Sequence, residues 1–245
     1  MTKTTSMYYN YDSTTNMSKE LIVLVKFNYI HHACFLLETD NDAIIFDPFL
    51  EGNPKNVQVK DIKVSHVLVT HAHGDHLGSA YAIVRNNNAL FISTAEVANA
   101  AAEAGCETHS MHLGGTYEYG FGKVRITPAF HGSGVAGGHA CGFIVNFHGT
   151  TIYYSGDTCL FSDMKLLGEL EKIDYAILPI GDNFTMGPSD AAKAVEFLGV
   201  QKVIPIHYNT WPVIAQDPEK FKQAVEAKGK AKVFIVKPGT SLDLE

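Results

Sequence analysis

Metal-ligand side chains are unusually dense in one short segment of the chain. Four of six consecutive positions carry them, at His71, His73, Asp75 and His76. They directly follow the β-prone segment 66–70, and in an extended chain residues two apart lie on one face, so the first two imidazoles can hold one cation between them. If the chain turns into a helix at Gly74, the aspartate and the third histidine point toward a second position beside the first. Burying three imidazoles and a carboxylate without a cation would be costly, so we expect a metal site here.

Three further candidate ligands stand at the ends of predicted strands: His131, Asp157 and His207. The apolar segments before them are 124–130, 151–154 and 203–206. Taken alone, a histidine or aspartate in such a position is more often a hydrogen-bonded structural residue. Because all three share this position, we expect them to meet the first group, and a carboxylate at Asp157 can bridge two cations.

The elements that must position these residues are mostly strands in the first half of the chain and alternating strands and helices in the second. Strands are predicted over 21–27, 34–37, 43–46, 66–70, 90–93, 123–127, 143–147, 151–154, 175–179, 202–205 and 232–236. Helices are predicted over 78–84, 95–104, 165–171, 191–198 and 218–227, with Ser189 as the N-cap of the fourth. This pattern predicts an α/β fold, specifically an αββα sandwich of two mixed β-sheets with helices on the outer faces.

Composition is that of an ordinary globular protein with one core or two closely packed halves. Of 245 residues, 46% are hydrophobic and 18% are charged. The segment 1–20 is polar and without a sustained period, so we expect a flexible N-terminal extension, with Met17 as an alternative start, before a single domain over 21–245. No C-x-x-C pair is present among the four cysteines, which argues against a cysteine zinc site.

Charge and hydropathy narrow the classes of partner. The formal net charge of −7 provides no overall attraction to nucleic acid or to anionic lipid, although a local basic patch stays possible. No apolar segment approaches the roughly 20 residues that span a bilayer, and no signal pattern precedes the first strand. We therefore expect a cytoplasmic protein that acts on a small molecule away from membranes, with homo-oligomerisation left open.

The order of the candidate ligands, H-x-H-x-D-H, then His, then Gly-Asp, then His, resembles the metallo-β-lactamase superfamily. Further motifs resemble a bacterial family of metal-dependent hydrolases related to ascorbate-6-phosphate lactonases: His32-Ala33-Cys34-Phe35, Asp47-Pro48-Phe49, Gly156-Asp157-Thr158, 178–187 and 207–210. The resemblance covers about 21–244. Ala72 and His31 stand where glycine is usual, and neither change removes a ligand.

The resemblance implies a binuclear centre. One metal would be held by His71, His73 and His131, the other by Asp75, His76 and His207, with Asp157 bridging the two. A histidine-rich set favours two Zn²⁺ ions, whereas the two carboxylates and the lactonase resemblance permit Mn²⁺.

The function implied is a binuclear metal-dependent hydrolase, in which a metal-bridging hydroxide attacks a small ester, lactone or phosphoester. Asp75 would orient the hydroxide and accept its proton. His32 and Asn183 are the candidate catalytic residues that assist the leaving group, with Tyr208 and Asn209 beside them. Asp47 is expected to hydrogen-bond a ligand imidazole rather than to bind metal itself.

Three alternatives remain at this stage. The first is a metal-dependent phosphodiesterase or ribonuclease, which the acidic net charge disfavours. The second is redox chemistry at a di-iron centre, which the imidazole of His73 disfavours, since relatives with that chemistry carry glutamate there. The third is a non-catalytic metal-binding protein, which intact ligands cannot distinguish from an enzyme.

Overall fold

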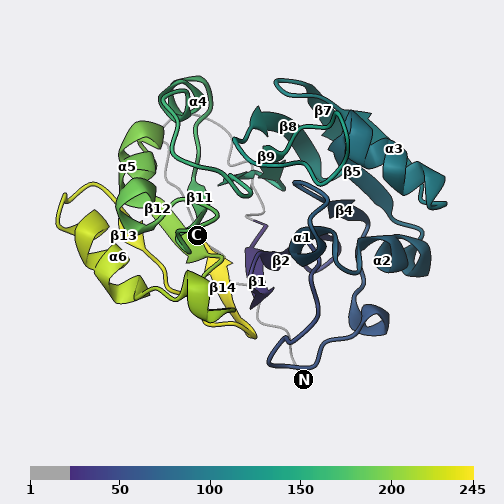
Figure 1. Cartoon of the computed structure of the whole chain (residues 1–245), viewed down its shortest axis with the longest axis horizontal. Helices are drawn as coiled ribbons and strands as arrows, with labels where there is room; N and C mark the ends of the chain where they lie inside the picture. Colours follow the sequence, from purple (N-terminus) through teal and green to yellow (C-terminus); the bar gives the residue numbers. More distant parts are fainter. Residues whose placement is uncertain (1–22) are drawn as a thin grey trace, which may run out of the picture.

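The structure, a computed structural model, describes residues 23–245, and the predicted N-terminal extension 1–20 lies outside the described residues. Two β-sheets face each other between two sets of helices (Figure 1). This is the predicted αββα sandwich. Within residues 23–245 no helix is long and apolar enough to cross a membrane.

The first sheet has seven strands in the order β14-β1-β2-β3-β4-β5-β6. They are β1 (Val25–His31), β2 (Cys34–Glu38), β3 (Ala43–Phe46), β4 (His66–Leu68), β5 (Leu90–Thr94), β6 (Thr108–Met111) and β14 (Thr240–Leu244). Pairing is antiparallel from β14 to β3 and parallel from β3 to β6, so the sheet is mixed.

The second sheet repeats this plan with seven strands in the order β13-β12-β11-β10-β9-β8-β7. They are β7 (Thr116–Tyr119), β8 (Gly122–Pro128), β9 (Cys141–Phe147), β10 (Thr150–Tyr154), β11 (Tyr175–Pro179), β12 (Lys202–Ile206) and β13 (Lys232–Val233). Strands β7 to β10 pair antiparallel, and β10 to β13 pair parallel.

Six α-helices and two 3-10 turns complete the described part of the chain. They are α1 (Gly74–Leu77), α2 (Ala80–Asn87), α3 (Ala95–Glu103), α4 (Met164–Leu170), α5 (Pro188–Leu198), α6 (Pro218–Glu226), η1 (Val59–Asp61) and η2 (Pro212–Ile214). Helices α2 and α3 cover the first sheet, whereas α4, α5 and α6 cover the second (Figure 1). Each sheet is therefore apolar on both faces, which explains the near-continuous apolar strands in the sequence.

The core has three layers, which follow from the alternation of side chains along each strand. In β1, Val25, Phe27 and Tyr29 point between the two sheets, whereas Ile30 packs with the residues beneath α2 and α3. A third cluster, which includes Tyr153 and Phe221, lies between the second sheet and its helices. The inner layer is rich in aromatic rings, as in the stacked pair Phe35 and Phe46, whose centroids are 4.5 Å apart.

Several details differ from the sequence-based predictions. The strand predicted over 21–27 is β1 at Val25–His31, with residues 21–22 outside the described part of the chain, and the strand predicted over 232–236 is β13 at Lys232–Val233. Strands β6, β7 and β14 were not predicted, because these edge strands are polar and partly exposed and lack an apolar run. The predicted N-cap Ser189 is wrong: α5 begins at Pro188, and Gly187 is its N-cap. Proline is favoured at the first helical position because its missing N–H needs no partner there.

Candidate metal centre

Seven predicted ligands converge at one edge of the sandwich, beside the carboxyl ends of β4, β8, β10 and β12. Local backbone geometry brings them there. After β10, Gly156 adopts a φ of +60°, and a Cβ at this position would lie 2.6 Å from the carbonyl oxygen of Cys141. Only glycine fits this turn, and the turn directs Asp157 toward the other predicted ligands.

The first group of ligand atoms comes from His71, His73 and His131, which all lie within 4.8 Å of one another. His71 and His73 follow β4, and their Nε2 and Nδ1 atoms are 3.0 Å apart. The imidazole of His131 arrives from the loop between β8 and β9, with its ring centroid 4.9 Å from that of His71. His71 and His73 share one face of an extended chain, as predicted, and the structure brings His131 to them from the second sheet.

The second group contains Asp75, His76 and His207, and the structure adds His32 to it. Helix α1 presents Asp75 and His76 together in one turn. The Oδ2 atom of Asp75 lies 3.9 Å from Nε2 of His76 and 4.0 Å from Nε2 of His207. These separations leave room for a cation among the three side chains.

Asp157 lies between the two groups. Its Oδ2 atom is 3.3 Å from Nε2 of His76, 3.1 Å from Nε2 of His207 and 3.8 Å from Nε2 of His131. One carboxylate thus reaches imidazoles of both groups, as a bridging ligand must.

The donor set fits a metal by a separate criterion. Within residues 23–245, Nε2 of His76 and both ring nitrogens of His207 are buried without a hydrogen-bond partner. Leaving a buried polar atom unpaired costs about 1–3 kcal/mol. A cation coordinated by these imidazoles removes that cost, so the residues fit divalent metal ions.

Asp47 is not one of the predicted ligands but contacts one of them, His76. Its fully buried carboxylate accepts hydrogen bonds from the N–H and hydroxyl of Thr70, both at 2.7 Å, and from the hydroxyl of Tyr154. Its Oδ2 atom also lies 2.7 Å from Nδ1 of His76. This contact holds Nδ1 as the protonated nitrogen and turns Nε2 toward the centre, as predicted for Asp47.

Opposing charges set the ionisation of the buried groups. Burial opposes ionisation of Asp157, but the neighbouring His76 and His207 outweigh it and hold the pKa of that carboxyl well below its usual range. Burial likewise opposes protonation of His76, but the carboxylates of Asp157 and Asp47 raise its pKa well above 6.5. The centre therefore attracts positive charge even without metal.

His32 contacts a predicted ligand and the loop after β12. Its Nε2 atom is 3.2 Å from Oδ2 of Asp75, and its Nδ1 atom is 2.8 Å from Oγ1 of Thr210. Burial lowers the pKa of His32 to about 4, which the hydrogen bond to Asp75 only partly opposes. The side chain of His32 is therefore mostly neutral near pH 7.

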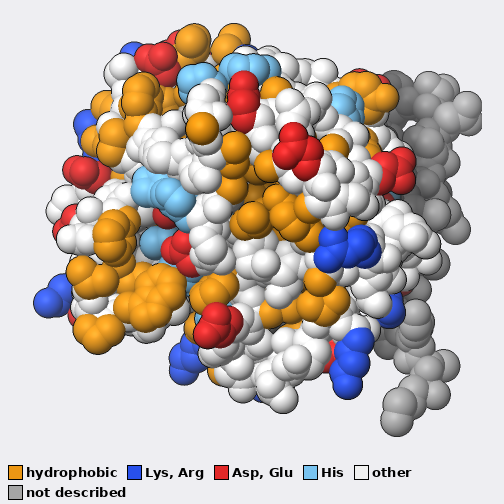
Figure 2. All heavy atoms as spheres, turned by 45° about the vertical axis from the view of Figure 1, so that its right-hand side comes forward, with side chains coloured by type: hydrophobic (Ala, Val, Ile, Leu, Met, Phe, Trp, Pro, Cys, Tyr) orange, Lys and Arg blue, Asp and Glu red, His pale blue; other side chains and the backbone are white. Residues whose placement is uncertain are grey.

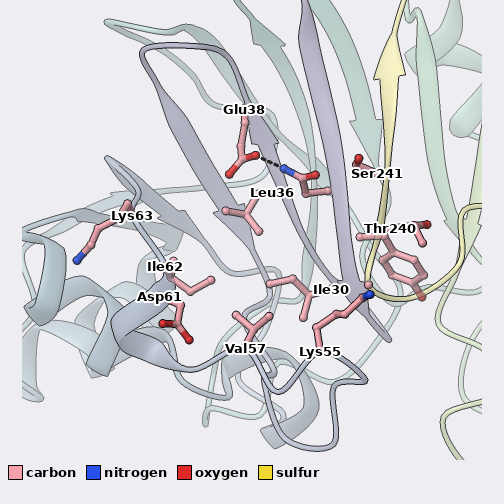
Figure 3. Close-up of a pocket in the computed structure, with 13 residues that line it drawn as sticks. Ile30, Leu36, Glu38, Lys55, Val57, Asp61, Ile62, Lys63, Thr240 and Ser241 are labelled. Carbon is pink, nitrogen blue, oxygen red and sulfur yellow. Dashed lines mark hydrogen bonds between the residues drawn. The ribbon is translucent and has the colours of Figure 1, made fainter. Parts of the chain in front are cut away.

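The other predicted catalytic side chains stand apart from the ligand cluster. Asn183 is exposed in the loop after β11, and among the described residues its side chain forms no hydrogen bond to a predicted ligand. Tyr208 packs with the helix-covered core, and Asn209 accepts a hydrogen bond from the N–H of Gln216. A cavity on the first sheet, lined by residues of β1, β2, β14 and the segment 55–63, contains no predicted ligand (Figure 3).

Comparisons with known proteins identify the family of the chain. A family model described as beta-lactamase superfamily domain matches residues 42–208. A UPF0173 metal-dependent hydrolase from Natranaerobius thermophilus is 51% identical over 221 residues, which cover 90% of this chain and 100% of the relative. The solved structure of Igni18, a metallo hydrolase from Ignicoccus hospitalis, has a TM-score of 0.84 and 35% identity and covers 91% of this chain and 99% of its own.

A more distant likeness concerns the fold alone. CmlA, a diiron β-hydroxylase from Streptomyces venezuelae, is 14% identical with a TM-score of 0.72, and the match covers 91% of this chain and 54% of that protein. At this identity it carries no argument about chemistry. By the family match and the closely related sequences, the chain belongs to the metallo-β-lactamase superfamily and, within it, to the UPF0173 metal-dependent hydrolases.

Proposed function

We propose that the protein is a binuclear metal-dependent hydrolase of a small ester, lactone or phosphoester. The observation that carries this proposal is the pair of ligand groups that share Asp157, with buried imidazole nitrogens of His76 and His207 left without other partners. His71, His73 and His131 would hold one metal, and Asp75, His76 and His207 the other. Zn²⁺ is favoured by the five imidazoles, and Mn²⁺ is the alternative.

Two bound divalent ions supply Lewis acidity and lower the pKa of a water molecule toward neutrality. The side chain of Asp75 is 29% exposed, whereas that of Asp157 is only 5% exposed. Asp75 is thus the carboxylate that faces the open side, where substrate arrives. Neighbouring His32 and His76 overcome the effect of its burial and keep its pKa below the usual range, so it is ionised and can accept a hydrogen bond from water and orient it. In the proposed reaction it also takes a proton from that water.

His32 orients this carboxylate. An ionised carboxylate only accepts hydrogen bonds, so Nε2 of His32 carries the proton, and Nδ1 accepts from the hydroxyl of Thr210. His32 is then a positioning residue for Asp75 rather than an acid for the leaving group.

The test is metal-dependent turnover of a small panel after reconstitution with Zn²⁺ or Mn²⁺. The panel contains 4-nitrophenyl acetate, a simple lactone, bis-4-nitrophenyl phosphate and a short RNA. We expect two metal ions per chain and turnover that Asp157→Asn lowers at least a hundredfold, whereas the exposed Asp190→Asn on α5 leaves it unchanged. Two bound metals without turnover of any substrate would favour the non-catalytic alternative, and turnover of RNA alone would favour the nuclease.

A further inference from the structure

Seven loop segments surround the candidate metal centre, and none contains lysine or arginine. These segments are 32–33, 47–54, 69–79, 129–140, 155–163, 180–187 and 207–217. The nearest lysine in sequence, Lys55, follows the second segment, but its side chain packs against Gly239 and lines the separate cavity on the first sheet. Recognition of a phosphate or carboxylate on a substrate normally uses such cations. Apart from the metal ligands, these loops therefore offer no fixed positive charge to an anionic substituent.

The same loops expose large apolar side chains instead. Phe130 is 62% exposed, Phe184 55%, Trp211 39% and Val213 55%. Tyr117 on β7 is the other exposed large aromatic residue in the described part of the chain. Exposed apolar groups that gather beside a polar centre are typical of a ligand-binding surface.

One cluster of aromatic side chains lies beside the second set of ligands. The ring of Trp211 packs edge-on against His32, with centroids 4.7 Å apart, and its centroid is 6.2 Å from that of Phe49. Because His32 contacts Asp75, a substrate group against Trp211 would lie close to the proposed base.

A second cluster of aromatic side chains lies beside Asp157. Phe130 immediately precedes His131 and packs on Phe161, with centroids 5.2 Å apart. Thr158, next to Asp157, connects two loops here: its hydroxyl accepts from the N–H of Phe130, and its carbonyl accepts from the N–H of Met186 in the loop that carries Phe184. We call Phe49, Phe130, Phe161, Phe184 and Trp211 the aromatic rim. On the face in Figure 2, hydrophobic side chains lie beside exposed histidine and acidic side chains.

We propose that the substrate is an uncharged ester or lactone whose aryl or medium-length alkyl group packs on the aromatic rim. This inference rests on the proposed hydrolase function and narrows its substrate class away from phosphorylated compounds. In the reaction, the oxygen of water bonds to the acyl carbon and the bond from that carbon to the leaving oxygen breaks. One water proton passes to Asp75 and then to the leaving oxygen, so an ester yields a carboxylic acid and an alcohol, and a lactone yields a single hydroxy acid.

The first arm of the test is a series of 4-nitrophenyl esters from acetate to hexanoate. Burial of each added methylene on the rim should raise kcat/KM roughly two- to fourfold. The hemiadipate ester replaces the terminal methyl of the hexanoate with a carboxylate, and we expect its kcat/KM to be at least tenfold lower. Phe184→Ala should reduce the hexanoate-to-acetate ratio, whereas the matched control Tyr117→Ala should leave the ratio unchanged.

The second arm needs no turnover. Trp211 is the single tryptophan of the chain, so its fluorescence reports on the rim. We expect the uncharged ketone 2-octanone to change this emission in a saturable way, and the anionic 6-oxoheptanoate to have at least tenfold weaker effect. A response to 2-octanone without hydrolysis of any ester would support recognition of apolar ligands while the hydrolase proposal fails.

Other outcomes overturn the inference. Hydrolysis of acetate with a flat chain-length dependence would leave the hydrolase proposal intact and refute the apolar substrate class. Equal or faster turnover of the hemiadipate ester would refute the exclusion of anionic substituents. If Phe184→Ala lowers the molecular mass by sedimentation while the ester ratio stays unchanged, the rim is a contact between two copies of the chain.

Discussion

At the scale of single residues, His32 connects three parts of the molecule. It lies in the turn between β1 and β2, contacts Asp75 of α1 and Thr210 after β12, and its carbonyl oxygen accepts the N–H of His207 at 2.9 Å. Its backbone φ of +55° is unusual for a residue other than glycine. Such conformations cost about 1–3 kcal/mol and persist where neighbouring structure imposes them, often at functional sites.

The ionisation of His32 predicts a pH dependence of stability in the metal-free protein. Burial is the main reason that the pKa of His32 is about 4 in the folded chain, whereas its ordinary value is 6.5. As the pH falls below 6.5 the unfolded chain binds a proton that the folded chain does not, so stability is lost until about pH 4. Between pH 7 and pH 4, wild-type protein should lose up to about 3 kcal/mol more unfolding free energy than His32→Gln.

Urea unfolding of chelated protein at a series of pH values measures this difference. Tyr117→Ala, on an edge strand, should follow the wild-type pH dependence. Parallel stability curves for wild type and His32→Gln would contradict the prediction.

At the scale of elements, the packing of α4 on α5 depends on a close backbone approach. A Cβ at Gly168 of α4 would lie 2.1 Å from the carbonyl oxygen of Leu198 at the end of α5. Glycine inside a helix normally costs about 1 kcal/mol relative to alanine. Here its small size outweighs that cost, because the neighbouring atom is backbone and cannot move aside freely.

Gly168→Ala should therefore destabilise the protein although alanine favours helix. Overpacking of this kind costs about 1–3 kcal/mol, and each kcal/mol lowers Tm by roughly 2–4 °C in a chain of this size. Differential scanning fluorimetry measures the change. Gly120→Ala is the control, because a Cβ there meets nothing within 4 Å, and an equal or higher Tm for Gly168→Ala would refute the argument.

At the scale of the whole molecule, the candidate metal centre joins the two sheets. His71, His73, Asp75 and His76 follow β4 of the first sheet, whereas His131, Asp157 and His207 come from loops of the second. A ligand that binds only the folded state stabilises it by mass action. Metal bound at this junction should thus hold the two halves of the sandwich together.

Removal of metal by a chelator should consequently lower Tm. At a free metal concentration of 100 Kd, binding contributes about 2.7 kcal/mol, which corresponds to roughly 5–10 °C for this length. The shift should be much smaller in Asp157→Asn, whose centre is already impaired, and unchanged in Asp190→Asn. An unchanged wild-type Tm after metal loss, verified by elemental analysis, would contradict a role of the centre in stability.

Sequence patterns were most informative where strands are buried on both faces. Strands such as β11 and β12 are continuous apolar segments bounded by turns, so their existence and approximate bounds were predictable. Strands β6, β7 and β14 were not, because edge strands depend on hydrogen bonds to one neighbour and carry polar side chains. The start of α5 depends on Pro188 rather than on the side chain of Ser189.

By itself, the sequence determined which residues could bind metal. Two histidines that are two positions apart after a strand, and a histidine or aspartate at the end of another strand, are local features that can be read from the chain. Tertiary structure alone decided the partners of those residues. Asp75 meets His32 across 43 positions, Asp47 meets His76 across 29, and Asn183 stays exposed outside the cluster. The aromatic rim likewise draws on five separate loops, because packing of two sheets, and not proximity in sequence, brings those loops to one edge.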